Sequence, residues 1–461
     1  MKKIFSIAFS LTAASVMLTG CMFEQDDFFD ESASLRIQHT NDEIQDLLCT
    51  QSTEGNGWVL QYFVAGTDDY SFPGFNIVAN FTKNGKVTMA SDHAYLRNNN
   101  AGKYTEASSL YDMLSEEGPM ISFNSWNDIL SVFADPMDPS QAPGTLVPDG
   151  FGMGGDYNLI VMSYGKDEIK LRGERYMARS RMIPCNMDPK DYIDACNAMK
   201  SSFCNDIQNP LTLTDGKTKR YVLNLHKGDF TVNDRVDDPL QSEQMSCVFT
   251  PKGLHIEKPH TLGGNEESVY QDFVFDTEKL IFVCEQNPEV KLLPAYDNAA
   301  DFFNHTLTTG LLWKVGVSES ASESMAAFLA KINSGMKGVV SNSKFKNIQL
   351  RGEIEKNKDG EILNRYMYVN VAYTSGIANL ESTLSFKCNF TENADGFTLS
   401  GDLTPDNTNA TKYKDKALVV EILDYFKDAT FTLSDTAPSI TRTEVKLTKS
   451  GADDSWFVMK Y

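Results

Sequence analysis

Hydrophobic and polar residues alternate along much of the chain, in short runs that turn-forming residues separate. Residues 57–63 and 75–81 are two such runs, and Lys-Asn-Gly-Lys at 83–86 leads into a third run at 87–89. An apolar–polar period of two is typical of strands with one buried face, and Asn-Gly is a strong signal for a tight hairpin. The pattern therefore predicts a mainly antiparallel β-sheet.

One strand–turn–strand unit occurs three times along the chain. In each copy Phe-Thr is followed by a short turn with glycine and by an alternating return strand, and the copies begin at Phe81, Phe249 and Phe390. Copies at intervals of about 150 residues suggest three related β modules. Because such hairpins are common and period-two patterns are generic, three unrelated hairpins are the alternative.

A few short segments between the β runs have apolar residues at helical spacing. These segments are 31–49, 125–133, 188–203, 320–332 and 415–426. The predicted fold class is α+β and β-dominated, with antiparallel sheets in two or three consecutive modules and short helices. Loop-rich stretches set the predicted module boundaries. The predicted units are a signal peptide at 1–20, an acidic tether at 21–30, and β-rich modules at 31–205, with a leading helix, 206–335 and 336–461.

The first twenty residues have the composition of a secretory signal peptide. Lys2 and Lys3 precede a largely apolar stretch at 4–18, and Leu-Thr-Gly-Cys follows at 18–21. Small residues leading into a cysteine resemble the bacterial lipobox, in which the thiol is acylated and the cysteine becomes the new N-terminus. The alternative is a plain signal peptide with an incidental cysteine. We predict lipid attachment, with acyl chains such as palmitate, at Cys21 and a mature chain anchored on the membrane.

Acidic residues follow the predicted lipid attachment site directly. Glu24, Asp26 and Asp27 lie within six residues of Cys21. This cluster resembles the surface-export signal of Bacteroidetes lipoproteins, although most charge runs are solvated tethers. The predicted location is the outer membrane, with the body of the protein exposed at the cell surface.

The charge balance excludes some classes of partner. The 461 residues include 42 Lys and Arg against 63 Asp and Glu, a net charge of −21. Binding to nucleic acid depends on neutralising phosphates with cationic side chains, so nucleic acid is not a predicted partner. Aromatic residues make up 11% of the chain, and this content disfavours long disorder.

Seven cysteines follow Cys21, and an odd number cannot all form pairs. They are Cys49, Cys185, Cys196, Cys204, Cys247, Cys284 and Cys388. A local bridge is plausible among the three at 185–204, because the predicted compartment permits disulfides. The last three of the seven fit small core residues on strands.

Candidate catalytic and metal-binding residues are few. His255 and His260 flank Glu257, but this spacing is not that of a helical HExxH motif, and no metal site is predicted. Glycines 150, 152 and 155 give GxGxxG by count, yet the motif precedes the predicted strand at 157–164 instead of following a strand, which disfavours nucleotide binding. No catalytic residue and no cofactor is assigned.

Tryptophan could also form a binding face for a sugar or a peptide. Trp58 and Trp126 lie in periodic apolar runs, and tryptophan in such a run is more often a core residue.

Several short motifs in the first half of the chain stand in a distinctive order. They occupy residues 28–33, 57–59, 81–87, 118–123, 154–157 and 169–173. In this respect the chain resembles the Bacteroidetes lipoproteins of domain-of-unknown-function family 4302, well over residues 21–184 and loosely beyond. The family offers no catalytic residues to transfer. Its members are similar to components of gene neighbourhoods with outer-membrane transporters and partner surface lipoproteins, which implies an accessory or binding role.

Three functions are compatible with these observations. The first is a non-catalytic binding or accessory component of an envelope uptake or surface-processing system, with a polymer or peptide ligand and a transporter or second lipoprotein as partner. The second is a surface hydrolase of glycans or peptides with carboxylate catalysis, which predicts a cleft with two or more acidic residues and at least one carboxyl group with a strongly raised pKa. The third is a structural or adhesin-type surface protein without a pocket. The sequence favours the first.

Overall fold

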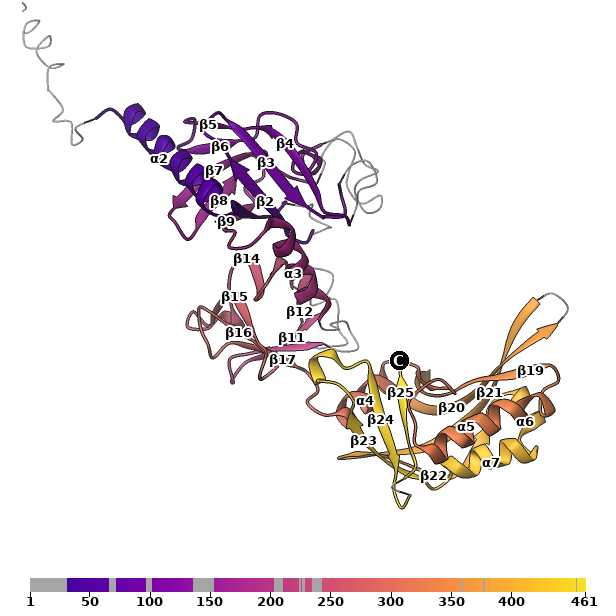
Figure 1. The fold of residues 1–461 in the computed structure, drawn as a ribbon. Coiled ribbons are helices and arrows are strands. Elements are labelled where there is room, and N and C mark those ends of the chain that lie inside the picture. The colour runs from indigo at the N-terminus through magenta and orange to yellow at the C-terminus, as the bar shows by residue number, and fades with distance from the viewer. Residues whose placement is uncertain are drawn as a thin grey trace, which may run out of the picture.

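The computed structural model describes residues 31–65, 72–96, 102–135, 153–202, 210–223, 225, 229–233, 243–357, 360–375, 378–452 and 454–461. Within these ranges the chain forms one nine-stranded sheet and two closed barrels, which follow one another from indigo to yellow in Figure 1. The strand pairings described are antiparallel, and short helices lie beside the sheets. The predicted fold class is therefore confirmed.

The first sheet has the strand order β4-β3-β2-β1-β9-β8-β7-β6-β5. Its strands are β1 (Trp58–Tyr62), β2 (Phe75–Phe81), β3 (Lys86–Ser91), β4 (Thr105–Leu110), β5 (Asp112–Leu114), β6 (Met120–Ser122), β7 (Asn158–Tyr164), β8 (Ile169–Gly173) and β9 (Arg179–Pro184). Only Tyr111 separates the edge strands β4 and β5, and its N–H donates to the carbonyl of Gly85 at 2.8 Å. The two ends of the sheet meet at this residue, so the sheet is close to a barrel.

The second and third sheets are closed eight-stranded barrels whose strands follow in chain order. The second barrel consists of β10 (Leu211–Thr214), β11 (Lys219–Leu223), β12 (Asp229–Asn233), β13 (Glu243–Thr250), β14 (Gly253–Thr261), β15 (Val269–Asp276), β16 (Ile281–Cys284) and β17 (Lys291–Pro294). The third barrel consists of β18 (Trp313–Val315), β19 (Ser343–Asn357), β20 (Gly360–Ser375), β21 (Ala378–Asn393), β22 (Gly396–Pro405), β23 (Thr430–Asp435), β24 (Glu444–Lys449) and β25 (Trp456–Lys460).

The helices lie outside these sheets or connect them (Figure 1). They are α2 (Ala33–Glu54), α3 (Pro189–Ser201), α4 (Ala299–Thr308), α5 (Glu323–Gly335), α6 (Thr408–Tyr413) and α7 (Ala417–Phe426), with short 3₁₀ turns η1 (Ser131–Phe133), η4 (Leu262–Gly264), η5 (Met336–Gly338) and η6 (Ser439–Thr441). Four predicted helical segments correspond to α2, α3, α5 and α7.

Helix α2 packs on the first sheet through its apolar stripe. Ser32 caps its N-terminus by accepting a hydrogen bond from the N–H of Leu35 at 3.4 Å. Ile44 and Leu48 are fully buried in the same core as Trp58 of β1. The indole N–H of Trp58 donates to the carbonyl of Leu48 at 3.3 Å, so the strand and the helix share both apolar and polar contacts.

Helix α3 connects the first sheet to the second barrel. Asp188 caps it, and Pro189 takes the first helical position, where a missing N–H costs nothing. Its buried residues Tyr192, Ile193 and Cys196 pack in one cluster with Val59 of β1. The same helix also contacts β13, so it lies at the joint of the two units.

Backbone contacts bring the first sheet against the second barrel, an interface that we call the first joint. The N–H of Gly74 donates to the carbonyl of Cys247 at 3.0 Å, and Asn76 Nδ2 donates to the carbonyl of Phe249 at 2.8 Å. A Cβ atom at Gly74 would lie 2.5 Å from a methyl group of Val248. The close approach of the two units therefore requires glycine at this position.

The interface between the second and third barrels, the second joint, is formed by the loop from β23 to β24. Ile440 of η6 belongs to the core of the second barrel. Arg442 is fully buried and donates from Nη1 to the carbonyl of Tyr296 at 3.0 Å and from Nη2 to the carbonyl of Asp297 at 3.2 Å. Its Nε donates to Asp435, so a single guanidinium joins the third barrel to the segment that connects it to the second barrel.

The structure differs from the sequence predictions in three places. Strand β18 pairs with β19 and β25, so the third barrel begins before the predicted boundary at residue 335. Residues 125–133 contain only η1, because Asn127 Oδ1 accepts from the N–H of Ile129 and thereby competes with helical hydrogen bonds. Trp126 is 48% exposed, whereas Trp58 is a core residue.

The repeated Phe-Thr hairpins occupy the turns β2–β3, β13–β14 and β21–β22. In the second and third barrels these are the fourth and fifth strands, so the two hairpins have equivalent positions. In the first sheet the hairpin joins the second and third strands. The equivalence therefore covers two of the three copies.

The cysteines described are buried. Cys185 and Cys196 are free thiols, so no bridge joins this pair, and Cys204 lies outside the described residues. Cys247 lies on β13, Cys284 on β16 and Cys388 on β21. These three are core residues on strands, as predicted.

Candidate functional site

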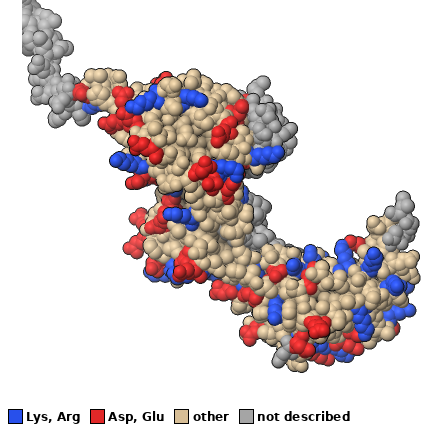
Figure 2. Space-filling view, in the orientation of Figure 1, with Lys and Arg blue, Asp and Glu red and all other residues tan. Residues whose placement is uncertain are grey.

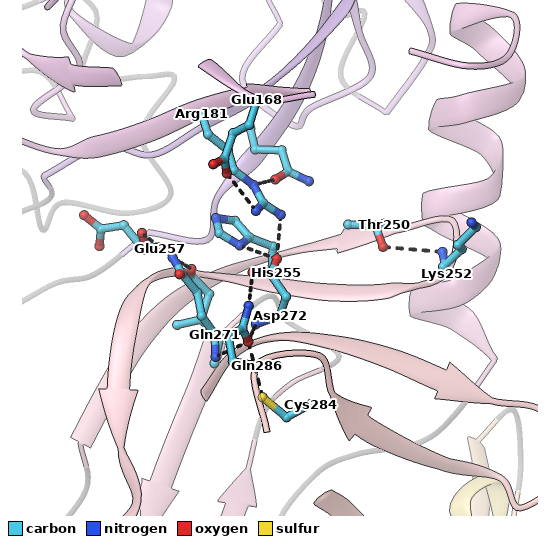
Figure 3. Close-up of polar contacts among 12 residues, drawn as sticks. Glu168, Arg181, Thr250, Lys252, His255, Glu257, Gln271, Asp272, Cys284 and Gln286 are labelled. Atoms are coloured by element: carbon cyan, nitrogen blue, oxygen red, sulfur yellow. Dashed lines mark hydrogen bonds and ion pairs between the residues drawn. The ribbon is translucent and has the colours of Figure 1, made fainter. Parts of the chain in front are cut away.

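A buried polar network crosses the first joint, and Arg181 of β9 lies at its centre (Figure 3). Its Nε donates to Gln61 Oε1 at 2.6 Å and its Nη1 donates to Glu168 Oε1 at 3.2 Å, both within the first sheet. Its Nη2 donates to Asp272 Oδ1 at 2.6 Å, and Asp272 belongs to β15 of the second barrel. One guanidinium therefore holds an amide and two carboxylates from two units.

Asp272 also has partners within its own barrel. His255 Nδ1 lies 2.8 Å from Asp272 Oδ1, and Gln286 Nε2 donates to Oδ2 at 2.8 Å. Gln286 Oε1 in turn accepts from the N–H of Asp272 at 2.9 Å and from the thiol of Cys284 at 3.3 Å. Strands β14, β15 and the end of β16 thus fix the carboxylate from three sides.

Burial and charge decide the protonation of this network. Burial raises the pKa of Asp272, but hydrogen bonds and charges from His255 and Arg181 outweigh it and hold the pKa below its ordinary value. Burial lowers the pKa of His255, and the hydrogen bond to Asp272 offsets this only in part. At neutral pH Asp272 is therefore ionised and His255 is neutral. Since a carboxylate only accepts, the imidazole proton is on Nδ1.

A cleft of about 390 Å³ lies beside the network. One wall comes from the first sheet and includes four basic side chains, Lys170, Arg172, Arg179 and Arg181. The other wall comes from β14 and β15 of the second barrel and includes His255, Glu257 and Gln271. The volume is in the range of small-molecule sites in proteins.

An irregularity in the second barrel shapes the cleft wall. The pairing of β14 with β15 shifts register between His255 and His260. Gln271 Nε2 donates to the carbonyls of Ile256 and Glu257, at 3.1 and 3.4 Å, and so satisfies the backbone there. Such bulges re-aim side chains beside functional sites.

A larger cavity of about 670 Å³ lies elsewhere at the first joint, between β2, α3 and β13. His93 lines it, but its Nε2 already lies 2.8 Å from the carbonyl of Ile129. Burial raises the pKa of Cys196, so this thiol stays protonated and unreactive at neutral pH. The smaller cleft, with its charged walls, is therefore the stronger candidate site.

The site residues predicted from the sequence lie outside the part of the chain that the structure describes. Cys21, Glu24, Asp26 and Asp27 belong to residues 1–30, which lie outside the described ranges. Glycines 150 and 152 of the GxGxxG sequence also lie outside them.

The two histidines that were weighed as metal ligands have separate surroundings. His255 bonds to Asp272 and lines the 390 Å³ cleft, whereas His260 stacks on Tyr270 and lies 3.7 Å from Glu243. Within the described ranges, no three His, Cys, Asp or Glu side chains come together in a way that could hold a metal ion. Among the helices described, none is both long and apolar enough to span a membrane.

The sequence contains one local signal for this site. Basic residues occupy four of the five outward positions on β8 and β9, which are Lys170, Arg172, Arg179, Arg181 and Ile183. By contrast, no local pattern connects Asp272 or Gln286 to Arg181. Asp272, the nearer of the two in sequence, is 91 residues away from Arg181.

The comparisons with known proteins give one match. A family described as a domain of unknown function (DUF4302) matches residues 25–277. This range includes all of the first sheet, α3 and the second barrel through β15, so it contains both sides of the first joint. No curated protein and no solved structure matches the chain significantly.

Proposed function

The chain belongs to the DUF4302 family of domains of unknown function, and we propose that it is a lipid-anchored outer-membrane protein, exposed at the cell surface. In this proposal it acts as a non-catalytic binding or accessory component of an envelope uptake or surface-processing system. The lipobox-like residues at 18–21 and the acidic residues that follow them support the location.

The observation that carries the binding role is the cleft at the first joint. Its walls come from two units that the Arg181 network holds together, so the cleft is preformed. Each nitrogen of the Arg181 guanidinium has its own acceptor, and Asp272 accepts from three side chains. These groups are committed to one another, which suits a clamp better than an acid–base catalyst.

A surface hydrolase is the second candidate, because the pair of His255 and Asp272 is one that hydrolases use. His255 lines the cleft, and Asp272 fixes its proton on Nδ1, so Nε2 could accept a proton. Two observations argue against this role. His255 is only 2% exposed. Burial raises the pKa of the Asp156 carboxyl, as a general acid would require, but Asp156 accepts from the N–H groups of Arg175 and Tyr176 and does not line the cleft. Hydrolysis of a glycan or peptide panel that His255→Gln abolishes would favour the hydrolase.

Proteinase treatment of intact cells tests the location. We expect the protein to be degraded on intact cells, and Cys21→Ala to release it from the membrane fraction. Replacing Glu24, Asp26 and Asp27 with the corresponding amides should leave the protein protected inside. The matched control changes three exposed acids of the second barrel, Glu266, Glu267 and Glu289, to Gln. Protection of the unmodified protein until the outer membrane is permeabilised would contradict surface exposure.

A further inference from the structure

The outer face of β8 and β9 carries an unusual concentration of positive charge. Side chains alternate along both strands: Ile169, Leu171 and Met182 face the core of the first sheet. The outward positions are occupied by four basic residues and Ile183; the basic ones are Lys170, Arg172, Arg179 and Arg181. These four line the 390 Å³ cleft together.

The strand register places these cations directly opposite one another. Lys170 pairs with Arg181, and Arg172 pairs with Arg179. Like charges directly opposite each other across two strands destabilise a sheet. This arrangement therefore lowers the folding stability of the ligand-free protein, and neighbouring acidic side chains determine how much of this loss is offset.

The first pair is neutralised by its surroundings. Arg181 bonds to Glu168 and Asp272, and Lys170 lies 3.4 Å from Glu168. With two carboxylates for two cations, this end of the face is balanced. It forms part of the clamp and needs no further anion.

The second pair is not neutralised. Arg172 has one acid nearby, Glu117, at 3.9 Å, and its Nε is buried with no hydrogen-bond partner among the residues described. The guanidinium of Arg179 is exposed and has no ion pair with any described residue; only its backbone N–H bonds to Glu257, at 3.3 Å. Two guanidinium groups thus face the cleft with one ion pair between them, the long contact of Arg172 with Glu117.

The location of this pair contrasts with the charge of the chain around it. Residues 21–298, which include the first sheet and the second barrel, carry 22 basic and 43 acidic residues, whereas residues 299–461 carry 18 and 20. Figure 2 shows lysine and arginine gathered mainly over the third barrel in this view. An arginine pair with a single long ion pair, in the strongly acidic part of the chain, is therefore a local exception, and it lies in a cleft.

We propose that this cleft binds an acidic saccharide, with Arg172 and Arg179 holding its carboxylate or phosphate group. The inference deepens the proposed binding function and rests on it. Arginine pairs suit such oxyanions because the guanidinium donates two parallel hydrogen bonds. Glu257 and Gln271 in the walls supply acceptors for hydroxyl groups, and the Glu257 carboxylate repels a second negative charge. Met162 and Pro259 supply apolar contact. A ligand with one anion, several hydroxyls and some apolar surface matches all of these groups.

The test is calorimetric titration of the chain 21–461 with a panel of uronic acids, sialic acid and sugar phosphates. Neutral sugars and inorganic phosphate serve as reference probes. We expect saturable binding of an acidic sugar, with the uronate and phosphate arms showing which oxyanion is preferred. Arg179→Gln and Arg172→Gln should each weaken it at least ~10-fold, the effect of losing a charge-assisted hydrogen bond. Lys86→Gln is the matched control, because Lys86 is exposed on β3 opposite an apolar residue, Leu110.

A second measurement needs no ligand. Because Arg172 and Arg179 repel each other, Arg179→Gln should leave unchanged or raise the melting temperature of the free protein, while Lys86→Gln leaves it unchanged. A clear fall with Arg179→Gln would show a structural role and overturn the proposal. Absence of binding by every acidic sugar, or binding that both arginine variants retain, would also overturn it. If only neutral sugars bound in the cleft, the proposal of an acidic ligand would be wrong, while the proposed binding function would stand.

Discussion

The two joints of the molecule use buried arginine in different ways. At the first joint Arg181 binds two carboxylates, and His255 and Gln286 extend the network through Asp272. At the second joint Arg442 binds one carboxylate and two backbone carbonyls, and Ile440 inserts into the core of the second barrel. The first joint thus includes side chains that titrate, beside a cleft, in addition to contacts with backbone carbonyls. The second joint is held largely by backbone acceptors and apolar packing. We therefore expect the stability of the first joint to depend on pH.

Arg181→Met should have the largest effect on stability. The change leaves the Asp272 carboxylate in a site where only 12% of its side chain is exposed, without its main counter-charge. Breaking a buried pair from one side costs about 3–5 kcal/mol of unfolding free energy. Urea unfolding of the chain 21–461 measures this loss. Arg175→Met is the control, because Arg175 is exposed in the same hairpin and its side chain stacks on Tyr176, away from Asp272. Equal effects of the two variants would contradict the clamp.

Arg442→Met should cost somewhat less, about 2–4 kcal/mol, because the carboxylate that it leaves behind can be solvated. The side chain of Asp435 is 35% exposed, so water can replace part of the lost contact. The carbonyls of Tyr296 and Asp297 lose their donors, and this accounts for much of the remaining cost. Limited proteolysis between residues 295 and 312, together with urea unfolding, measures the effect. Lys344→Met, an exposed change on β19, should leave both unaltered.

Acidification should weaken the first joint through His255. Burial lowers the pKa of His255 in the folded protein below 6.5, its ordinary value in an unfolded chain. At pH values between these two pKa values, the unfolded chain therefore binds more protons than the folded one. Stability therefore falls as the pH drops below about 6.5, by up to about 1.4 kcal/mol for each unit of pKa difference. The lowered pKa of Asp272 acts in the same direction, but only below about 3.8.

Unfolding curves at several pH values between 7.5 and 5 test this dependence. His255→Gln keeps a donor for Asp272 but cannot take up a proton, so it should flatten the profile. His39→Gln, an exposed change on α2, should not alter it. An unchanged profile with His255→Gln would assign the pH dependence to other groups.

The contrast between the joints also shows what sequence patterns can predict. Alternation and turns predicted antiparallel sheet and four of the helices, because these depend on local period and capping. The segment 125–133 has helical spacing, but the side chain of Asn127 takes the hydrogen bonds that a helix would need. The partners of Arg181 come from β1, from the residue before β8 and from β15, and nothing local links them. The alternating cations of β8 and β9 were a local signal for one wall of the cleft, while the opposite wall depends on tertiary packing.

The smallest expected change in stability distinguishes the two ion pairs of Arg181 from its hydrogen bond to Gln61. Gln61 is fully buried, its Oε1 accepts from Arg181 Nε, and its Nε2 has no hydrogen-bond partner among the residues described. Gln61→Met removes a bond to a charged group, a loss of about 1.5–3 kcal/mol, but it also removes an orphan donor whose burial costs about 1–3 kcal/mol. The two terms nearly cancel, so unfolding free energy should change by less than about 1 kcal/mol. A loss as large as that of Arg181→Met would instead mean that the amide, and not the two carboxylates, holds the guanidinium in place.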